Sequence, residues 1–422
     1  MKDEAIESAF EAACETYAKL GVDPWEALRK LENLSLSIHC WQGDDVAGFE
    51  APDAELSGGG IQVTGNYPGK ARNVEELRSD MEQAYALLPG KHRVNLHAMY
   101  GEFGGERVNR DAIEPGHFRG WVEWAREHGL GFDFNATCFS HQLAAAGYTL
   151  SSPDARVREF WVEHSKRCRS IGAWIGEQMG KPCIHNLWIP DGCKDNPVDR
   201  LGFREHLDAS LAEVYAQEFP ASHLKDSVEC KLFGIGSEAY VVGSHEFYLA
   251  WAMKHGKMIC LDMGHFHPTE SVADKISALL PFFPELLLHV SRGVRWDSDH
   301  VVAFGDELRA LTQEVVRADA LGRVHFALDY FDGSMNRVGA WVTGARATLK
   351  ALLAALLEPT QRLRSYESEG LFFERLALLE EAKTLPVGAV WDYHCLKHDV
   401  PAGTEWIRDV AAYERRVQSL RV

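Results

Sequence analysis

Short runs of strand-forming residues alternate with long amphipathic stretches over most of the chain. Eight such runs occur, at residues 34–43, 93–101, 129–136, 183–192, 226–234, 257–266, 286–292 and 324–332. Helical periodicity is clearest between them at 74–88, 156–179, 201–219, 272–280 and 307–321. Neighbouring parallel strands need a crossover of about a dozen or more residues, so this alternation predicts a parallel sheet of the α/β class.

The ends of the runs favour a closed barrel over a doubly wound open sheet. Most runs carry polar side chains near their C-terminal ends, including His39, His97, Asn135, Glu229, Asp262, His289 and Asp329. In a barrel these ends meet on one rim, where active sites lie, whereas in an open sheet they would be spread along an edge. With eight runs, the sequence predicts a (β/α)8 TIM barrel.

Helical segments are expected on both sides of this barrel. Residues 1–33 are expected to be helical, with a break at 21–24 where Asp23 can cap a second helix that begins at Pro24. Residues 34–345 are expected to form the catalytic barrel. Residues 346–422 exceed what one closing helix requires, and we expect them to form a helical extension that contacts neighbouring subunits.

Composition excludes several classes of protein. The 422 residues contain 44 Lys and Arg against 62 Asp and Glu, a net charge of −18, so neither a nucleic acid nor an anionic membrane is an expected partner. No apolar stretch has the length of a membrane span, and the acidic N-terminus does not resemble a signal peptide. Nine scattered cysteines without a C-x-x-C pair indicate reduced thiols and a cytoplasmic protein.

Hard metal ligands gather at the predicted rim. Four come from successive runs, namely Glu229, Asp262, His289 and Asp329, and three come from the loops just beyond, namely His265, Asp297 and Asp299. A single strand-end carboxylate usually caps a loop, and His289 alone could be a core histidine. Together, however, these groups would form a negative pocket that needs a cation. Seven ligands predict two ions, and carboxylates with few imidazoles favour Mn²⁺, Mg²⁺ or Co²⁺.

Aromatic and amide side chains complete the predicted rim. Trp41, Phe134 and Trp188 lie at the ends of runs, as do Gln42, Asn135 and Asn186. Aromatic rings can stack on the C–H faces of a sugar while amides bind its hydroxyls, although each ring could equally pack the mouth of the barrel. A polyol is the substrate class that this lining favours.

Five segments resemble the L-rhamnose isomerase family: SIHCWQGDD at 37–45, NYPGKA at 66–71, LWIPDG at 187–192, LDMGHFHPTE at 261–270 and VRWDSDH at 294–300. The resemblance runs nearly end to end. It implies a (β/α)8 barrel, a homotetramer, and interconversion of L-rhamnose and L-rhamnulose. It also implies two divalent ions per subunit, with Mn²⁺ preferred and Zn²⁺, Co²⁺ or Mg²⁺ as alternatives. Met263 and Gly293 depart from the family pattern, but neither removes a ligand.

The resemblance also implies roles for single residues. Glu229, Asp262, His289 and Asp329 correspond to ligands of a structural metal that also hold substrate oxygens. His265, Asp297 and Asp299 correspond to ligands of a catalytic metal. His97 and Lys231 correspond to residues that meet the substrate, and Trp188 corresponds to a wall of the site.

The expected reaction moves a hydrogen between C1 and C2 of the sugar. A hydride shift is favoured over proton transfer through an ene-diol, because it needs no base beside C1. Lys231 would place a positive charge near O1, or would instead balance Glu229, and His97 could assist ring opening. Alternatives are a metal-dependent sugar epimerase, a phosphoester hydrolase on the same ligands, and a sugar-binding protein without activity.

Overall fold

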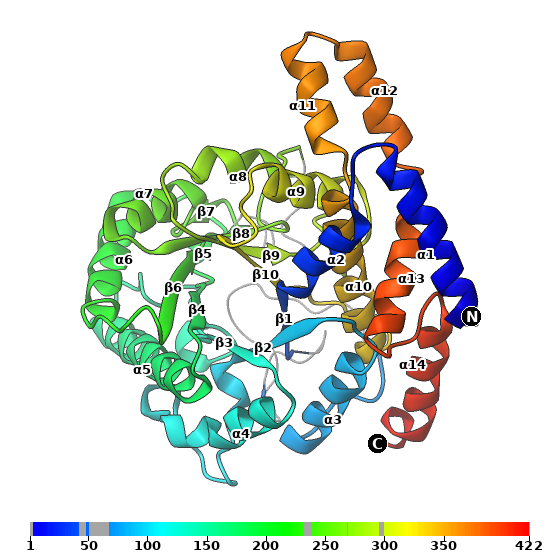
Figure 1. Ribbon diagram of the computed structural model, residues 1–422. Helices are drawn as coiled ribbons and strands as arrows, with labels where there is room; N and C mark the ends of the chain where they lie inside the picture. The colour runs from blue at the N-terminus through cyan, green and yellow to red at the C-terminus, as the bar shows by residue number, and fades with distance from the viewer. Residues whose placement is uncertain are drawn as a thin grey trace.

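The computed structural model describes residues 3–41, 48–49, 67–231, 238–267, 269–294 and 299–421. Within these residues, eight parallel strands close into a barrel in the order β1-β10-β9-β8-β6-β4-β3-β2 (Figure 1). The strands are β1 Ser35–His39, β2 Lys91–His97, β3 Gly131–Asn135, β4 Cys183–Leu187, β6 Leu224–Glu229, β8 Met258–Asp262, β9 Leu286–Val290 and β10 Val324–Leu328. Each strand falls within or overlaps one of the eight predicted runs, and the predicted barrel is confirmed.

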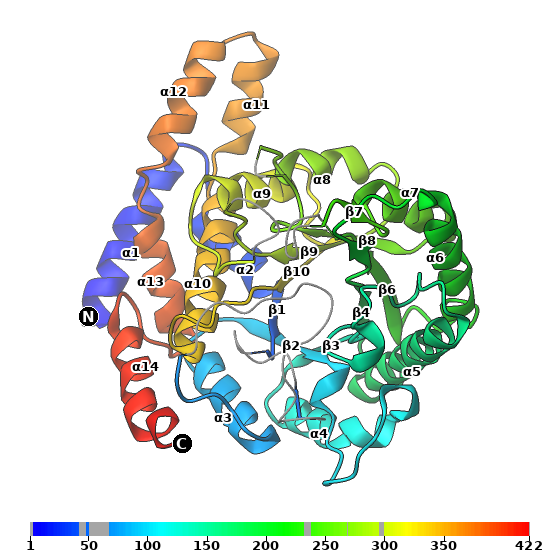
Figure 2. The ribbon, with the colours of Figure 1, turned by 180° about the vertical axis from the view of Figure 1, so that it is seen from behind.

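Helices surround the barrel on its outer side, as both ribbon views show (Figures 1 and 2). They are α3 Val74–Tyr85, α4 Arg119–Glu127, α5 Ala155–Met179, α6 Arg200–Val214, α7 His245–His255, α8 Ala273–Leu279, α9 Asp306–Arg317 and α10 Arg337–Leu356. The longest, α5, begins at the capping carboxylate of Asp154 and ends at Gly180, whose φ of 63° is the left-handed conformation that stops a helix.

A small antiparallel pair, which the sequence pattern did not predict, lies beyond the barrel strands. It joins β5 Gly192–Cys193 to β7 Tyr240–Val241. The run at 183–192 was expected to be one strand, but β4 ends at Leu187. Pro190 follows shortly afterwards, and proline cannot donate a hydrogen bond to a strand ladder.

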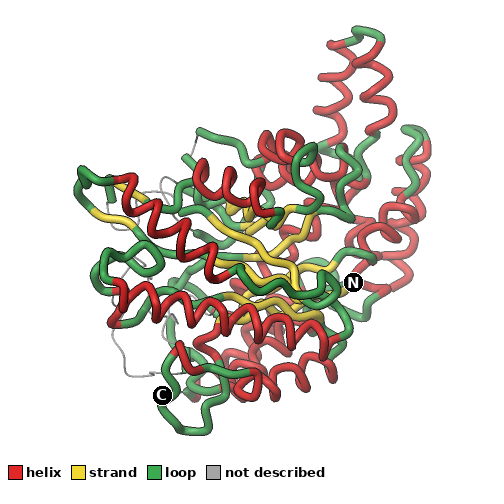
Figure 3. The backbone as a smooth tube through the Cα atoms, turned by 90° about the vertical axis from the view of Figure 1, so that its left-hand side faces the viewer, coloured by secondary structure: helices red, strands yellow, loops and turns green. Residues whose placement is uncertain are grey.

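Helices from both ends of the chain pack together beside the barrel. At the N-terminal end lie α1 Asp3–Ala18 and α2 Pro24–Glu32, and Asp23 caps α2 as predicted, accepting a hydrogen bond from the Trp25 amide. At the C-terminal end lie α11 Thr360–Ser368, α12 Phe372–Ala382, α13 Val387–Lys397 and α14 Glu405–Arg416. The rings of Phe10 and Tyr393 stack 3.9 Å apart between α1 and α13. The hairpin of α11 and α12 projects away from the barrel (Figures 1 and 3).

The helix α10 runs across the boundary expected between residues 345 and 346, and packs on α9, α2 and α3. The division into a barrel and a C-terminal extension therefore stays a prediction. Among the described residues, no single helix is both long and apolar enough to cross a membrane; α10 and α11 pass such a test only as a pair bent by 52°. All nine cysteines lie in the described part of the chain and are free thiols.

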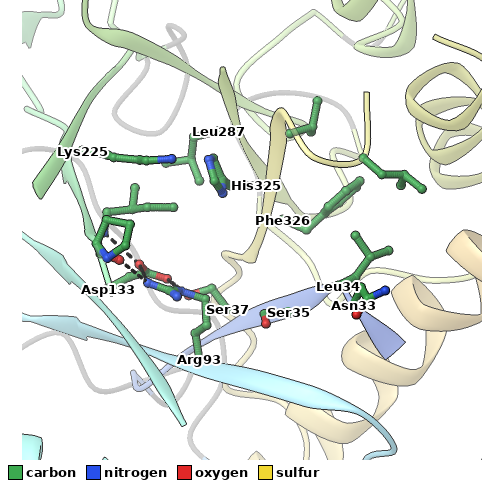
Figure 4. Close-up of a pocket in the computed structure, with 14 residues that line it drawn as sticks. Asn33, Leu34, Ser35, Ser37, Arg93, Asp133, Lys225, Leu287, His325 and Phe326 are labelled. Atoms are coloured by element: carbon green, nitrogen blue, oxygen red, sulfur yellow. Dashed lines mark hydrogen bonds and ion pairs between the residues drawn. The ribbon is translucent and has the colours of Figure 1, made fainter. Parts of the chain in front are cut away.

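The N-terminal end of the barrel holds a pocket of about 240 Å³ with charged walls (Figure 4). Arg93 donates hydrogen bonds to Asp133 at 2.7 and 2.8 Å, and Ser37 donates to the same carboxylate at 2.6 Å. Lys225, which also lines this pocket, forms an ion pair of 2.5 Å with Glu285. Because these charges are already paired, this end of the barrel stabilises the fold, and the chemistry belongs to the opposite rim.

Candidate metal centre

Four neighbouring strands place their polar ends at one point of the C-terminal rim. Glu229 is the last residue of β6, Asp262 is the last of β8, His289 is the fourth of β9, and Asp329 directly follows β10. These strands are consecutive around the barrel, and the register sets Asp262 beside His289. One donor atom from each of the four residues lies within 4.8 Å of the others. The barrel thus brings together four of the predicted ligands.

The donor atoms of this cluster point to a common centre. His289 Nδ1 lies 3.0 Å from Asp329, 3.3 Å from Glu229 and 3.5 Å from Asp262, measured to a carboxylate oxygen of each. Among the described residues, His289 Nδ1 and one oxygen of each carboxylate have no hydrogen-bond partner of good geometry. Buried polar atoms are costly unless they are paired or bind a cation, so this donor set fits a metal ion.

The carboxylates of this cluster lie so close together that their negative charges repel, and a bound cation would relieve that repulsion. Burial raises the pKa of Asp262 to about 7 and the pKa of Asp329 to about 6. Burial also opposes ionisation of Glu229, but the neighbouring His289 and His265 lower its pKa overall. For His289, burial is outweighed by neighbouring Cys260 and Glu229, which raise its pKa well above the ordinary value. The cluster therefore stabilises positive charge at its centre.

A second cluster adjoins the first and shares Asp262 with it. Its donors come from Asp262, His265 and Asp299 and also lie within 4.8 Å of one another. His265 Nδ1 lies 2.9 Å from the Cys230 carbonyl, and its Nε2 faces Asp299 at 3.7 Å. Ser291 donates to the carboxylates of both Asp262 and Asp299, at 3.0 and 3.4 Å. Such outer contacts orient metal ligands, and the pair of clusters suits two ions.

The turn between Asp262 and His265 is shaped to fit the second cluster. The Gly264 amide donates to Asp262 at 2.6 Å. A Cβ added at Gly264 would lie only 1.9 Å from Asp299 Oδ1, so the bare backbone leaves space for that carboxylate. The predicted ligand Asp297 lies outside the described residues.

Lys231 follows β6 and is buried beside the clusters. Its ammonium group donates to the Pro190 carbonyl at 2.9 Å and to Glu238 at 2.5 Å. The sequence left open whether Lys231 balances Glu229; in the described part of the chain, Glu238 is one carboxylate that pairs with it. No sequence motif marks Glu238.

His97 and two of the predicted aromatic residues line the same rim. His97 Nδ1 lies 3.0 Å from the Thr137 hydroxyl, and its ring meets the Trp41 ring edge to face at 4.8 Å. Trp188 lies nearly parallel to the His265 ring at 6.3 Å. Burial lowers the pKa of His97 to about 3, with Arg110 acting in the same direction, so its imidazole is neutral near pH 7.

Phe134 lies elsewhere, although it was predicted to contact the sugar. Its ring packs edge to face on Phe118 at 4.9 Å, in the layer between β3 and the surrounding helices. The next residue, Asn135, points the other way and donates to Asn95 inside the barrel at 2.6 Å. Because side chains alternate along a strand, only one of these neighbours can face the barrel interior.

Some polar residues at the site carried little or no sequence signal. Asn186, which the sequence indicated only as a rim amide, donates a short hydrogen bond to Glu229 and thereby orients it. Ser291 and Thr137 were not predicted, because a single hydroxyl after a strand has no distinctive spacing. Each lies directly beyond or near the end of a strand, which is the only signal that could have indicated it.

Comparison with known proteins places the whole chain in one family. The family model "L-rhamnose isomerase (RhaA)" matches residues 4–421. The L-rhamnose isomerase of Rhodopirellula baltica is 58% identical over 416 residues, covering 99% of this chain and 97% of the relative. That of Salmonella typhimurium is 56% identical and covers 99% of both chains. A solved structure titled L-ribulose 3-epimerase has 12% identity and a TM-score of 0.46, covering 79% of this chain and 98% of that chain. From its match over nearly the full length, the chain belongs to the L-rhamnose isomerase family.

Proposed function

We propose that the chain is a metal-dependent aldose–ketose isomerase that interconverts L-rhamnose and L-rhamnulose. The observation that carries this proposal is the pair of buried donor clusters sharing Asp262 at the barrel rim, in a chain whose relatives of that name match over 99% of its length. An isomerase needs no separate oxidant or water, and a closed rim of carboxylates, imidazoles and aromatic rings suits a polyol.

The first cluster would hold one ion through Glu229, Asp262, His289 and Asp329. His265, Asp297 and Asp299 would hold the second. When bound, divalent ions supply Lewis-acid polarisation of the sugar oxygens and stabilise the negative charge that develops on them. Mn²⁺ is the proposed ion, because oxygen donors outnumber imidazoles, and Zn²⁺, Co²⁺ and Mg²⁺ are accepted by the same donors.

The side chains around the clusters orient the sugar. Trp188 and Trp41 offer ring faces or edges to its C–H groups, and the carboxylates of the first cluster meet its hydroxyls. Lys231 holds a positive charge near O1, and Glu238 and the Pro190 carbonyl fix the position of its ammonium group. His97, whose imidazole is neutral at pH 7, would assist the opening of the sugar ring.

In the direction of the ketose, O2 loses its proton and a hydride moves with its electron pair from C2 to C1. O1 then gains a proton, so no atom is lost or added. Turnover in deuterated water tests this route, since a hydride shift leaves the carbon-bound hydrogen unexchanged. Solvent deuterium at C1 or C2 would instead support proton transfer through an ene-diol.

The proposed assembly is a homotetramer in the cytoplasm. Support comes from α12, whose Phe372, Phe373 and Leu376 are 61%, 77% and 59% exposed on a hairpin that projects away from the barrel (Figure 1). Apolar side chains that gather on a protruding element are typical of a subunit contact. Nine free cysteines suit a reducing compartment.

A sugar assay with restored metal tests the activity. Protein stripped with EDTA should be inactive on L-rhamnose and should produce ketose once Mn²⁺ is added. Asp297→Asn should nearly abolish turnover while leaving the far-UV circular dichroism unchanged. Release of an epimeric aldose, hydrolysis of a phosphoester, or tight sugar binding without product would each reject the isomerase in favour of the corresponding alternative.

A further inference from the structure

A second group of potential metal ligands lies outside the barrel rim, between helices from the two ends of the chain. Glu32 is the last residue of α2, His394 lies in α13, and His398 directly follows α13. One donor atom from each lies within 4.8 Å of the others. In Figure 1, α13 lies beside α1 on the outer side of the barrel.

The three side chains face one another without being bonded to one another. His394 is 1% exposed, and its Nδ1 has no hydrogen-bond partner among the described residues; the same holds for Nε2 of His398. In that part of the chain no side-chain hydrogen bond or ion pair joins any two of the three; His398 and His394 share only the backbone bond from the His398 N–H to the His394 carbonyl, at 3.3 Å. Buried imidazole nitrogens usually find a partner, and these two atoms are therefore available to bind a metal ion.

The spacing of the histidines suits a metal site. Positions four apart on a helix lie on the same face one turn apart, and the two rings are 4.6 Å from each other at 74°. Two imidazoles and one carboxylate are a donor set of Zn²⁺, which takes four ligands and can keep a water in the last position. The rim clusters, by contrast, are built mainly from carboxylates.

We infer that Glu32, His394 and His398 form a zinc site that fastens α2 to the end of α13. The ion would tie the N-terminal helical segment to the C-terminal helices at the side of the barrel. Its role is structural, and it is independent of the proposed sugar chemistry.

The charges around this zinc site are compatible with metal binding. Burial lowers the pKa of His394 to about 3, and repulsion from His398 and His92 acts in the same direction. Burial also lowers the pKa of His398, with Glu32 opposing and Lys397 adding to the effect. Both imidazoles are therefore neutral near pH 7, which is the form that binds a metal. The Glu32 carboxylate supplies the negative charge.

Zinc content of the full chain tests the inference. Wild type, Glu32→Gln and His398→Ala are dialysed against the same free Zn²⁺ concentration, and bound zinc is measured by mass spectrometry. Each variant should bind about one Zn²⁺ fewer per chain than wild type. Zinc should also raise the Tm of wild type by several degrees more than that of either variant. Co²⁺ in place of zinc should give the strong visible absorption of a four-coordinate site, and both variants should lose it.

Two further variants separate this site from other effects. His255 is the last residue of α7, and its ring stacks on Trp251 four residues earlier, so His255→Ala should retain wild-type zinc content. Asp262→Asn damages the rim and should retain the zinc-dependent gain in Tm that Glu32→Gln loses. Equal zinc content and Tm gain in wild type and Glu32→Gln would overturn the inference. If His398→Ala does not fold, Glu32→Gln decides the outcome. Gln has the same shape as the half-buried Glu32 side chain, so this variant should fold.

Discussion

Replacing Gly264 by alanine should disable the second cluster without unfolding the barrel. The new Cβ would lie 1.9 Å from Asp299 Oδ1, whereas ordinary contact begins at 3.4 Å, so the carboxylate must retreat by about 1.5 Å. A displacement of about 1 Å at a reacting centre costs about 100-fold in rate. We therefore expect kcat/KM for L-rhamnose to fall by about 100-fold, or about 2.7 kcal/mol of transition-state stabilisation.

The assay combines steady-state kinetics with a Mn²⁺ titration of the metal-free protein. Gly264→Ala should weaken the affinity of one ion by about 10- to 100-fold, as the loss of a ligand's orientation does in other metal sites. Gly322→Ala is the matched control, because nothing lies within 4 Å of a Cβ built there, and it should behave as wild type. Wild-type kinetics and metal affinity in Gly264→Ala would refute the assignment of Asp299 as a ligand.

Three further outcomes are expected. Arg93 and Ser37 lower the pKa of Asp133 despite its burial, so the stability it contributes is present at neutral pH and is lost as the pH falls below about 4. Asp133→Asn should lower the free energy of unfolding at pH 7 by about 3–5 kcal/mol, as measured by urea denaturation. The free energy of unfolding of the variant should also fall less steeply below about pH 4 than that of wild type. The same pH dependence in both proteins would contradict this prediction. Phe373→Glu should reduce the assembly to smaller species by light scattering, whereas an intact tetramer would exclude α12 from its interfaces. Removal of divalent ions by EDTA should lower the Tm by several degrees and added Mn²⁺ should restore it, and an unaltered Tm would contradict binding at the buried rim.

The fold was predictable because one physical constraint repeats along the chain. Each strand is short and is followed by enough residues for a helical crossover, and polar residues gather at or just beyond the ends of most strands. Glu229, Asp262 and His289 were therefore identifiable as residues of one rim although they lie far apart in the sequence. The end of β4 at Leu187 was not predicted, because the run at 183–192 was expected to be one strand although it contains Pro190.

Contacts that depend on the exact face or register of an element were harder to predict. Phe134 and Asn135 are adjacent, and the alternation that turns one toward the barrel interior turns the other toward the helices. Lys231 and Glu238 form an ion pair seven residues apart, and no strand or helix spacing predicts that pair. His394 and Glu32 meet only because α13 returns to the N-terminal helices, a long-range packing that local periodicity does not reveal.

The number of Mn²⁺ ions bound at the rim tests the central claim most directly. A calorimetric titration of the metal-free chain should find about two Mn²⁺ ions per subunit. Glu229→Gln should lose mainly one of them and Asp299→Asn mainly the other, while Asp262→Asn should weaken both because its carboxylate belongs to both clusters. A wild-type chain that binds no Mn²⁺, or an Asp262→Asn variant that binds both ions as tightly as wild type, would contradict the two-ion rim.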